Sequence, residues 1–253
     1  MKIEIIPCLN DNYSYLLYDE ISNTIAIIDP SEYEACHKII DKNYKRLDFI
    51  LNTHHHFDHV GGNEKLKKKY NSTVLGFGND RNRIPVIDEV LKDNQEFKIG
   101  SLSFTTIFIP GHTKGHVAFY FKKEKVLFTG DTLFSLGCGR VFEGTYKQMF
   151  QSLNKLKNLP GDTKIYCGHE YTFTNLKFCL KFNPNNKFLK EKKDYVEQCL
   201  KNKKPTIPTT ISEEIKTNIF FRFNDPDVEK AINLENSSEL EIFTKLRELK
   251  DSF

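Results

Sequence analysis

Seven residues that can bind a metal ion each come shortly after an apolar, strand-like run of the sequence. Four of them lie together in the segment THHHFDH, residues 53–59, and three follow separate runs further along the chain. The seven are His54, His56, Asp58, His59, His112, Asp131 and His169. Strand runs mixed with a few helices, with polar ligands at the strand ends, predict a layered α/β fold.

Three of the imidazoles can serve one ion. In an extended segment residues i and i+2 point to the same side, so His54 and His56 can bind together while His55 points elsewhere. His112, which follows a later strand run, completes three nitrogen ligands.

The remaining ligands can serve a second ion beside the first. Asp58 and His59 come after a turn, and His169 joins them. Asp131 has two carboxylate oxygens and is the natural bridge. Imidazole and carboxylate together suit Zn, Fe or Mn, and the absence of a Cys ligand argues against a soft-metal site. We therefore expect two divalent metal ions as cofactors and a hydrolase as the type of enzyme.

Two further residues are candidates for supporting roles. His116 is a ligand by residue type, but a hydrogen-bonding role beside the ligands is favoured because the first ion already has three nitrogens. Asp29 either orients a ligating histidine through its other ring nitrogen or simply forms a turn before Pro30.

The first two-thirds of the chain are predicted to consist mainly of strands. Two pairs of runs have hairpin spacing, and two segments are predicted as helices. The predicted strands are 14–18, 24–28, 48–51, 97–100, 102–109, 117–121, 126–129 and 164–167, and the helices are 31–43 and 63–70.

The strand-like alternation of the sequence stops after Tyr171. Residues 174–204 are predicted as Lys-rich helices, Pro205 and Pro208 as a linker, and Glu239–Lys250 as a final amphipathic helix. We expect a catalytic domain over residues 1–171 and a smaller α-helical, substrate-binding domain over residues 172–253. The Lys-rich stretch is either a solvated helical face, which is favoured, or an added attraction for anions.

Composition excludes several classes of protein. The formal charge of +3 is too small to indicate nucleic acid or membrane partners, and no run approaches the roughly 18 apolar residues of a membrane span. The six cysteines are widely spaced, which is typical of reduced thiols. The chain starts directly on a strand pattern, so we expect no leader within this sequence, although a chain from which a leader was removed would look the same. We expect a monomeric, cytoplasmic protein.

The segment THHHFDHVGG, residues 53–62, resembles the hallmark of the metallo-β-lactamase superfamily, an αββα sandwich. Further segments across the whole chain are similar to the glyoxalase II (hydroxyacylglutathione hydrolase) family. They are DNY (11–13), PGHTKGH (110–116), TGDTLF (129–134), GCGR (137–140), CGHEYT (167–172), PTIPTT (205–210) and RELKD (247–251). The resemblance to the superfamily rests on the metal motif, and the resemblance to the narrower family rests on the C-terminal helical domain.

The resemblance implies hydrolysis of S-D-lactoylglutathione, and other 2-hydroxyacylglutathiones, to D-lactate and glutathione, the second step of methylglyoxal detoxification. Asp58 and Asp131 would act through a hydroxide that bridges the metals and attacks the thioester carbonyl. The resemblance also implies a set of glutathione-binding residues, Arg140, Tyr171, Arg247 and Lys250.

Two positions depart from the family pattern. Phe142 stands where the family usually has Tyr, which removes one hydroxyl and is expected to weaken binding by about 1 kcal/mol. The segment Asn218–Arg222 (NIFFR) lacks the proline of the family's NPFLR.

Other functions fit the sequence less well. A glutathione persulfide dioxygenase of the same superfamily would use one iron, would not need His169 as a second-metal ligand and would lack the helical domain. A phosphodiesterase or nuclease would need nucleic-acid-binding appendages. A non-catalytic relative would be expected to have lost ligands, whereas all seven positions are filled.

Overall fold

The protein, described over residues 1–253 by a computed structural model, folds into two units, each built from two separate stretches of chain. Unit 1 comprises Met1–Phe108 and Lys114–Gly130, and unit 2 comprises Ile109–Thr113 and Asp131–Phe253. The predicted domain boundary after Tyr171 stays a prediction.

Unit 1 is organised around a mixed sheet with the strand order β1-β2-β3-β4-β5-β6. The first three strands are antiparallel, and β3 to β6 run parallel to one another. The strands are β1 (Lys2–Cys8), β2 (Asn12–Asp19), β3 (Thr24–Ile28), β4 (Phe49–Leu51), β5 (Thr73–Phe77) and β6 (Glu89–Leu91). Parallel neighbours need crossovers, and helices α1 (Tyr33–Asn43), α2 (Phe57–Val60) and α3 (Asn63–Tyr70) lie within those connections.

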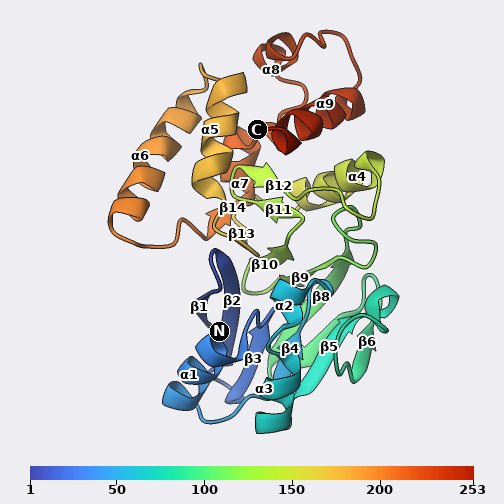
Figure 1. Ribbon diagram of the computed structural model, residues 1–253, viewed down its shortest axis with the longest axis vertical. Coiled ribbons are helices and arrows are strands. Elements are labelled where there is room, and N and C mark those ends of the chain that lie inside the picture. Colours follow the sequence, from blue (N-terminus) through green and yellow to red (C-terminus); the bar gives the residue numbers. More distant parts are fainter. The chain divides into compact units, whose positions relative to one another are not determined.

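The two faces of this sheet are covered by different layers. Helices α1 and α3 lie over one face, where Ile40 and Leu66 join Leu16 in one buried cluster (Figure 1). Adjacent residues of a strand point to opposite faces, and the neighbouring ring of Tyr15 meets Phe128 of a second sheet at 5.2 Å between ring centroids.

The strands of this second sheet that belong to unit 1 form an antiparallel run in the order β10-β9-β8-β7. They are β7 (Glu96–Ile99), β8 (Leu102–Phe108), β9 (Val117–Phe121) and β10 (Val126–Gly130). Unit 1 is thus a layer of helices on two stacked sheets.

Unit 2 is mainly helical. Its short strands form two antiparallel pairs. The hairpin pairs β11 (Leu133–Phe134) with β12 (Gly137–Cys138), and β13 (Lys164–Cys167) pairs with the distant β14 (Thr209–Thr210). Its helices are α4 (Tyr146–Lys157), α5 (Thr172–Phe182), α6 (Lys187–Lys201), α7 (Ile211–Thr217), α8 (Pro226–Ala231) and α9 (Glu239–Asp251).

The helices of unit 2 are held by caps and by an aromatic core. Capping boxes start α4, α7 and α9, so their first backbone N–H groups have acceptors. Phe243 of α9 packs against Phe150, Phe220 and Phe223.

Most of the predicted elements are confirmed. Both hairpins form, and the final helix runs from Glu239 to Asp251. The predicted helix 31–43 begins only at Tyr33. Strands β5 and β6 and helix α4 were not predicted. Residues 205–208 form the expected irregular connection between α6 and β14, but Thr206 within it is fully buried. No helix has the length and apolarity to cross a membrane. All six cysteines are buried and none forms a disulfide.

Candidate metal centre

The metal-binding motif lies where β4 ends. The strand stops at Leu51, residues 52–56 form an irregular turn, and α2 starts at Phe57. His54 and His59 are fully buried, whereas the side chain of Asp58 is 36% exposed. The motif therefore presents its predicted ligands from a short turn and one helical turn, and they differ in exposure to solvent.

Asp29, at the end of β3, organises this turn. Its Oδ1 accepts the backbone N–H of Thr53 at 2.8 Å, and its Oδ2 accepts the Thr53 hydroxyl at 2.6 Å. Oδ2 also lies 3.0 Å from Nδ1 of His59. A carboxylate only accepts, so Nδ1 of His59 carries the proton and Nε2 is the basic nitrogen.

The same logic fixes the tautomer of His54. The single proton of the Thr53 hydroxyl is donated to Asp29, so that hydroxyl accepts from Nδ1 of His54, 3.1 Å away. Nε2 is again the basic nitrogen. The ligand atoms of Asp29, His54 and His59 also lie within 4.8 Å of one another, so Asp29 could itself be a ligand. Because both of its oxygens already accept hydrogen bonds, it fits an orienting role better than a ligand role.

Asn12, at the start of β2, supports Asp58. Its Nδ2 donates to Oδ2 of Asp58 at 2.9 Å and to the Asp58 backbone carbonyl at 3.1 Å. The role of Asn12 was not predicted, although it belongs to the DNY segment. A lone Asn gives no sequence signal for a partner 46 residues away.

His55 points away from the other histidines toward a different carboxylate. Its Nδ1 lies 3.1 Å from Oδ2 of Asp80, which is fully buried and also pairs with Arg83. A side chain at Gly115 would collide with Asp80, because a Cβ there would lie 2.0 Å from Oδ1. Asp80 was missed from the sequence, and it explains why His55, the middle histidine of the run, is not grouped with the others.

His116 lies within unit 1 beside His54. Its fully buried ring stacks on the ring of His54, with 4.6 Å between centroids and a 21° interplanar angle. A side chain at Gly130, which has φ +47°, would meet Thr53 and His116 at under 3 Å. His116 is in none of the ligand groups, so packing against a ligand is its observed position.

Unit 2 carries the other three predicted ligands. Oδ2 of Asp131 lies 3.4 Å from Nε2 of His112 and 3.2 Å from Nε2 of His169. Nδ1 of His112 donates to the backbone carbonyl of Arg140 at 2.8 Å, which leaves Nε2 as its basic nitrogen. One carboxylate oxygen therefore sits beside one histidine of each predicted ligand set.

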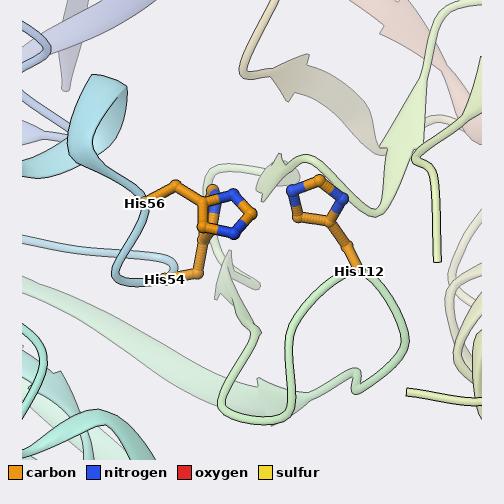
Figure 2. Close-up of side chains that lie close together, drawn as sticks. All are labelled: His54, His56 and His112. Atoms are coloured by element: carbon orange, nitrogen blue, oxygen red, sulfur yellow. The ribbon is translucent and has the colours of Figure 1, made fainter. Parts of the chain in front are cut away.

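Two groups have the composition and spacing of metal sites. Figure 2 shows His54, His56 and His112 close together, and their ligand atoms lie within 4.8 Å of one another. The ligand atoms of Asp58, His59 and His169 form a second such group. Each group contains the residues that the sequence assigned to one ion. Neutral imidazole nitrogens with carboxylate oxygens are the donors that divalent transition metals bind, so the residues fit such ions.

The predicted glutathione residues of unit 2 differ in exposure. The side chain of Arg140 is 60% exposed, with its Nε 3.6 Å from Oδ1 of Asp251. Tyr171 is partly exposed, and its ring stacks on His169 with 4.7 Å between centroids. The ring of the exposed Phe142 lies 5.2 Å from that of His112.

The basic pair on α9 is less accessible. Arg247 is only 2% exposed and donates to Cys138 and Asp251. The ammonium of Lys250 lies over the rings of Phe178 and Phe253, and burial lowers the pKa of Lys250.

Comparison with known proteins covers the whole chain. Residues 12–169 match the family model of the metallo-β-lactamase superfamily, and residues 170–253 match that of the hydroxyacylglutathione hydrolase C-terminus. The hydroxyacylglutathione hydrolase of Pelagibacter ubique is 49% identical over all 253 residues and covers both chains completely. The chain belongs to the hydroxyacylglutathione hydrolase, or glyoxalase II, family.

Solved structures agree with the fold. The BLEG-1 B3 metallo-β-lactamase superposes with a TM-score of 0.68 at 24% identity, over 87% of this chain and all of that one. TTHA1623, solved in a di-iron-bound form, gives a TM-score of 0.57 at 25% identity, over 67% of this chain and 92% of that one. This glyoxalase II family member therefore has a metallo-β-lactamase fold with a C-terminal helical domain.

In this glyoxalase II family member, the GCGR segment (residues 137–140) packs against the predicted ligands of unit 2. Gly139 packs directly on Asp131, because a Cβ at this glycine would lie 1.9 Å from the Asp131 carbonyl oxygen and 3.2 Å from Nδ1 of His112. The second glycine of the GCGR segment, Gly139, is thus required by close packing.

Proposed function

We propose that this protein hydrolyses S-D-lactoylglutathione, and other 2-hydroxyacylglutathiones, to D-lactate and glutathione with two divalent metal ions. One observation carries the proposal: Oδ2 of Asp131 lies within 3.4 Å of both His112 and His169, one from each metal-binding group. The full-length similarity to a protein named hydroxyacylglutathione hydrolase supports the substrate.

The metal ions are proposed to sit in the two groups. His54, His56 and His112 would hold the first, Asp58, His59 and His169 the second, and Asp131 would bridge them. The di-iron form of TTHA1623 supports two ions in this fold, whether they are Zn, Fe or Mn here. Bound divalent ions would supply Lewis acidity and would lower the pKa of bound water to about 7.

The residues around the ligands would keep them basic and correctly oriented. Asp29 holds the proton of His59 on Nδ1, and the Arg140 carbonyl does the same for His112. The leaving group is a thiolate whose conjugate acid has a pKa of about 8.5, so its departure needs no separate general acid. The absence of a predicted general acid from the sequence is consistent with thioester chemistry.

On the substrate side, residues 172–253 are proposed as the domain that contributes to glutathione binding. The exposed Arg140 and the partly buried Lys250 would attract the two carboxylates of glutathione, and Tyr171 would contact the substrate beside His169. We further propose that the protein acts as a monomer in the cytoplasm, in the second step of methylglyoxal detoxification.

A direct assay tests the proposal. The purified protein is incubated with S-D-lactoylglutathione while thioester loss is followed, and the metal content of the same sample is measured. Turnover with about two ions per chain is expected. No turnover by the metal-replete protein would overturn the thioesterase proposal, and oxygen uptake with glutathione persulfide would replace it with the dioxygenase.

A further inference from the structure

Two cysteines of unit 1 contact each other where β1 meets α1. Cys8 is the last residue of β1, and Cys36 lies in the first turn of α1. Their Sγ atoms are 3.9 Å apart, although the two residues are 28 positions apart in the chain. Both belong to the buried cluster beneath the helices of unit 1, with 3% and 0% of their surfaces exposed. The wide spacing of the cysteines in the sequence did not indicate this pair.

A chain of hydrogen bonds fixes the proton positions in the pair. The Ser14 hydroxyl donates its proton to the Asp29 carbonyl at 2.7 Å, so it accepts from Cys8, whose Sγ is 3.4 Å away. Because the Cys8 proton is directed to Ser14, the sulfur of Cys8 accepts from the Cys36 thiol. The pair is thus separated by one side chain from Asp29, the residue that holds the proton of His59 on Nδ1.

The same contact makes Cys8 the more acidic thiol of the pair. The Cys36 thiol donates to Cys8 and lowers the pKa of Cys8, whereas this contact and burial raise the pKa of Cys36 well above its usual value. Elsewhere in the protein, burial raises the pKa of Cys167 and Cys179 to about 12. The thiolate is the nucleophile, so Cys8 is placed to react first and Cys36 to react with the product.

We propose that Cys8 and Cys36 form a reversible oxidation site, at which a hydroperoxide converts the two thiols into one disulfide that joins β1 to α1. The Cys8 thiolate attacks one peroxide oxygen, and the O–O bond breaks. A sulfenic acid forms on Cys8, while the other oxygen takes up the Cys8 proton and leaves as an alcohol or as water.

The second step closes the disulfide. The Cys36 sulfur attacks the Cys8 sulfur, the S–O bond breaks, and the departing hydroxide takes up the Cys36 proton and leaves as water. In total the two thiols lose two electrons and the hydroperoxide gains two. The sulfur atoms must approach from 3.9 Å to about 2.05 Å, which we expect from rotation of the two side chains. Two molecules of a small thiol reverse the reaction by exchange. The site needs neither the metal ions nor the thioester substrate.

The test treats the full-length native protein with hydrogen peroxide, alkylates the remaining thiols and maps the cysteines by mass spectrometry. No Lys or Arg lies between the two cysteines, so trypsin leaves both in one peptide, residues 3–38. This peptide should lose two hydrogen atoms and escape alkylation. After a further cut following Glu20, its two parts should stay joined until they are reduced. Dithiothreitol added to the oxidised native protein should restore both thiols.

Cys199 is the matched control, because it is the most exposed of the six cysteines at 8%. If access to solvent alone determined oxidation, Cys199 would react first. Cys199→Ser should leave disulfide formation unchanged. Cys36→Ser should abolish the disulfide and leave a sulfenic acid on Cys8, which dimedone traps. The peptide map of the wild-type protein decides the question even if a variant does not fold.

Three results would overturn the proposal. The first is oxidation of Cys199 while the peptide 3–38 keeps both thiols. The second is a disulfide that forms in urea but not in the native protein, because contact in the fold would then not be its cause. The third is a peroxide product of Cys8 that dithiothreitol cannot reduce, which would place the residue beyond the reversible steps of thiol oxidation.

Discussion

The two halves of the candidate site are supported in different ways. In unit 1 the motif loop, residues 53–59, is held by Asn12, Asp29 and Asp80, which lie within 46 residues of their partners. Two of these three supports are buried carboxylates, and each faces a histidine. The loop is therefore fixed by charged groups of its own unit that act directly on the histidine rings.

In unit 2, side chains from residues far along the chain bind the backbone of the β11–β12 hairpin. Oε2 of Glu214 accepts the N–H of Leu136 at 2.8 Å, and Nδ2 of Asn218 donates to the Gly137 carbonyl at 3.0 Å. Arg247 binds Cys138 from 109 residues away. In this chain the C-terminal helices therefore hold the backbone of the segment that leads to Arg140.

The largest effect is expected at Asp131, the proposed bridging ligand, which comes just before the β11–β12 hairpin. Removing a residue that supports a metal ligand lowers metal affinity or activity by about 10–100-fold. Asp131→Asn changes a proposed ligand itself, so it should lower kcat by more than about 100-fold. It should also lower the bound metal below two ions per chain. Metal analysis and kcat on one sample check both. A variant with two ions and full activity would remove Asp131 from the bridging position.

Asp29 and Asp80 provide the next test, within the motif loop. Both are buried carboxylates beside a histidine, but only Asp29 faces a predicted ligand, His59. Asp29→Asn keeps a residue that tolerates φ +48° and should lower metal affinity or kcat by about 10–100-fold.

Asp80→Asn is the matched control. It removes the charge that faces His55 and Arg83, so it should lower the free energy of unfolding by about 1–3 kcal/mol. Its kcat per folded, metal-replete molecule should stay within about threefold of wild type. Equal losses of kcat in the two variants would show that the loop responds as a whole, and the distinction between its two carboxylates would fail.

The motif loop was readable from the sequence because its ligands are close together and follow one strand. The sequence also separated His55 from His54 and His56, although these residues lie in an irregular turn and not in the extended segment that the prediction assumed. The supports were not readable, since Asp80, Glu214 and Asn218 are single polar residues whose partners lie in other elements. Arg247 shows the same limit, because its hydrogen bonds to Cys138 and Asp251 could not be predicted from the sequence.

Glu214 tests the hairpin support through stability. It is fully buried and accepts from Leu136, Thr209 and Asn218. Glu214→Ala leaves these donors without their acceptor and should cost about 1–3 kcal/mol of unfolding free energy. Glu214→Gln keeps an acceptor for Leu136 and Asn218, so it should cost less. Urea unfolding of the three proteins measures the order.

The same carboxyl predicts a pH dependence. Burial raises the pKa of Glu214 above its usual value of 4.5. A raised pKa means that the protonated form is favoured in the fold, so its contribution is fully present below pH 4.5 and is lost as the pH rises through the folded pKa. The stability of wild type relative to Glu214→Gln should therefore fall as the pH rises above 4.5. A difference that stays constant with pH would contradict the buried, proton-linked carboxyl.

The smallest expected effect is at Phe142, next to the hairpin. Its exposed ring lies 5.2 Å from that of His112, and the family usually has Tyr at this position. Phe142→Tyr adds one hydroxyl that can bind substrate, worth about 1 kcal/mol, so KM should fall about fivefold with kcat unchanged. Phe142→Leu keeps an apolar side chain without the ring and should not lower KM. A change in kcat or in metal content, with KM unchanged, would contradict this expectation. It would show that residue 142 acts on the neighbouring His112 through its side chain and does not bind the substrate.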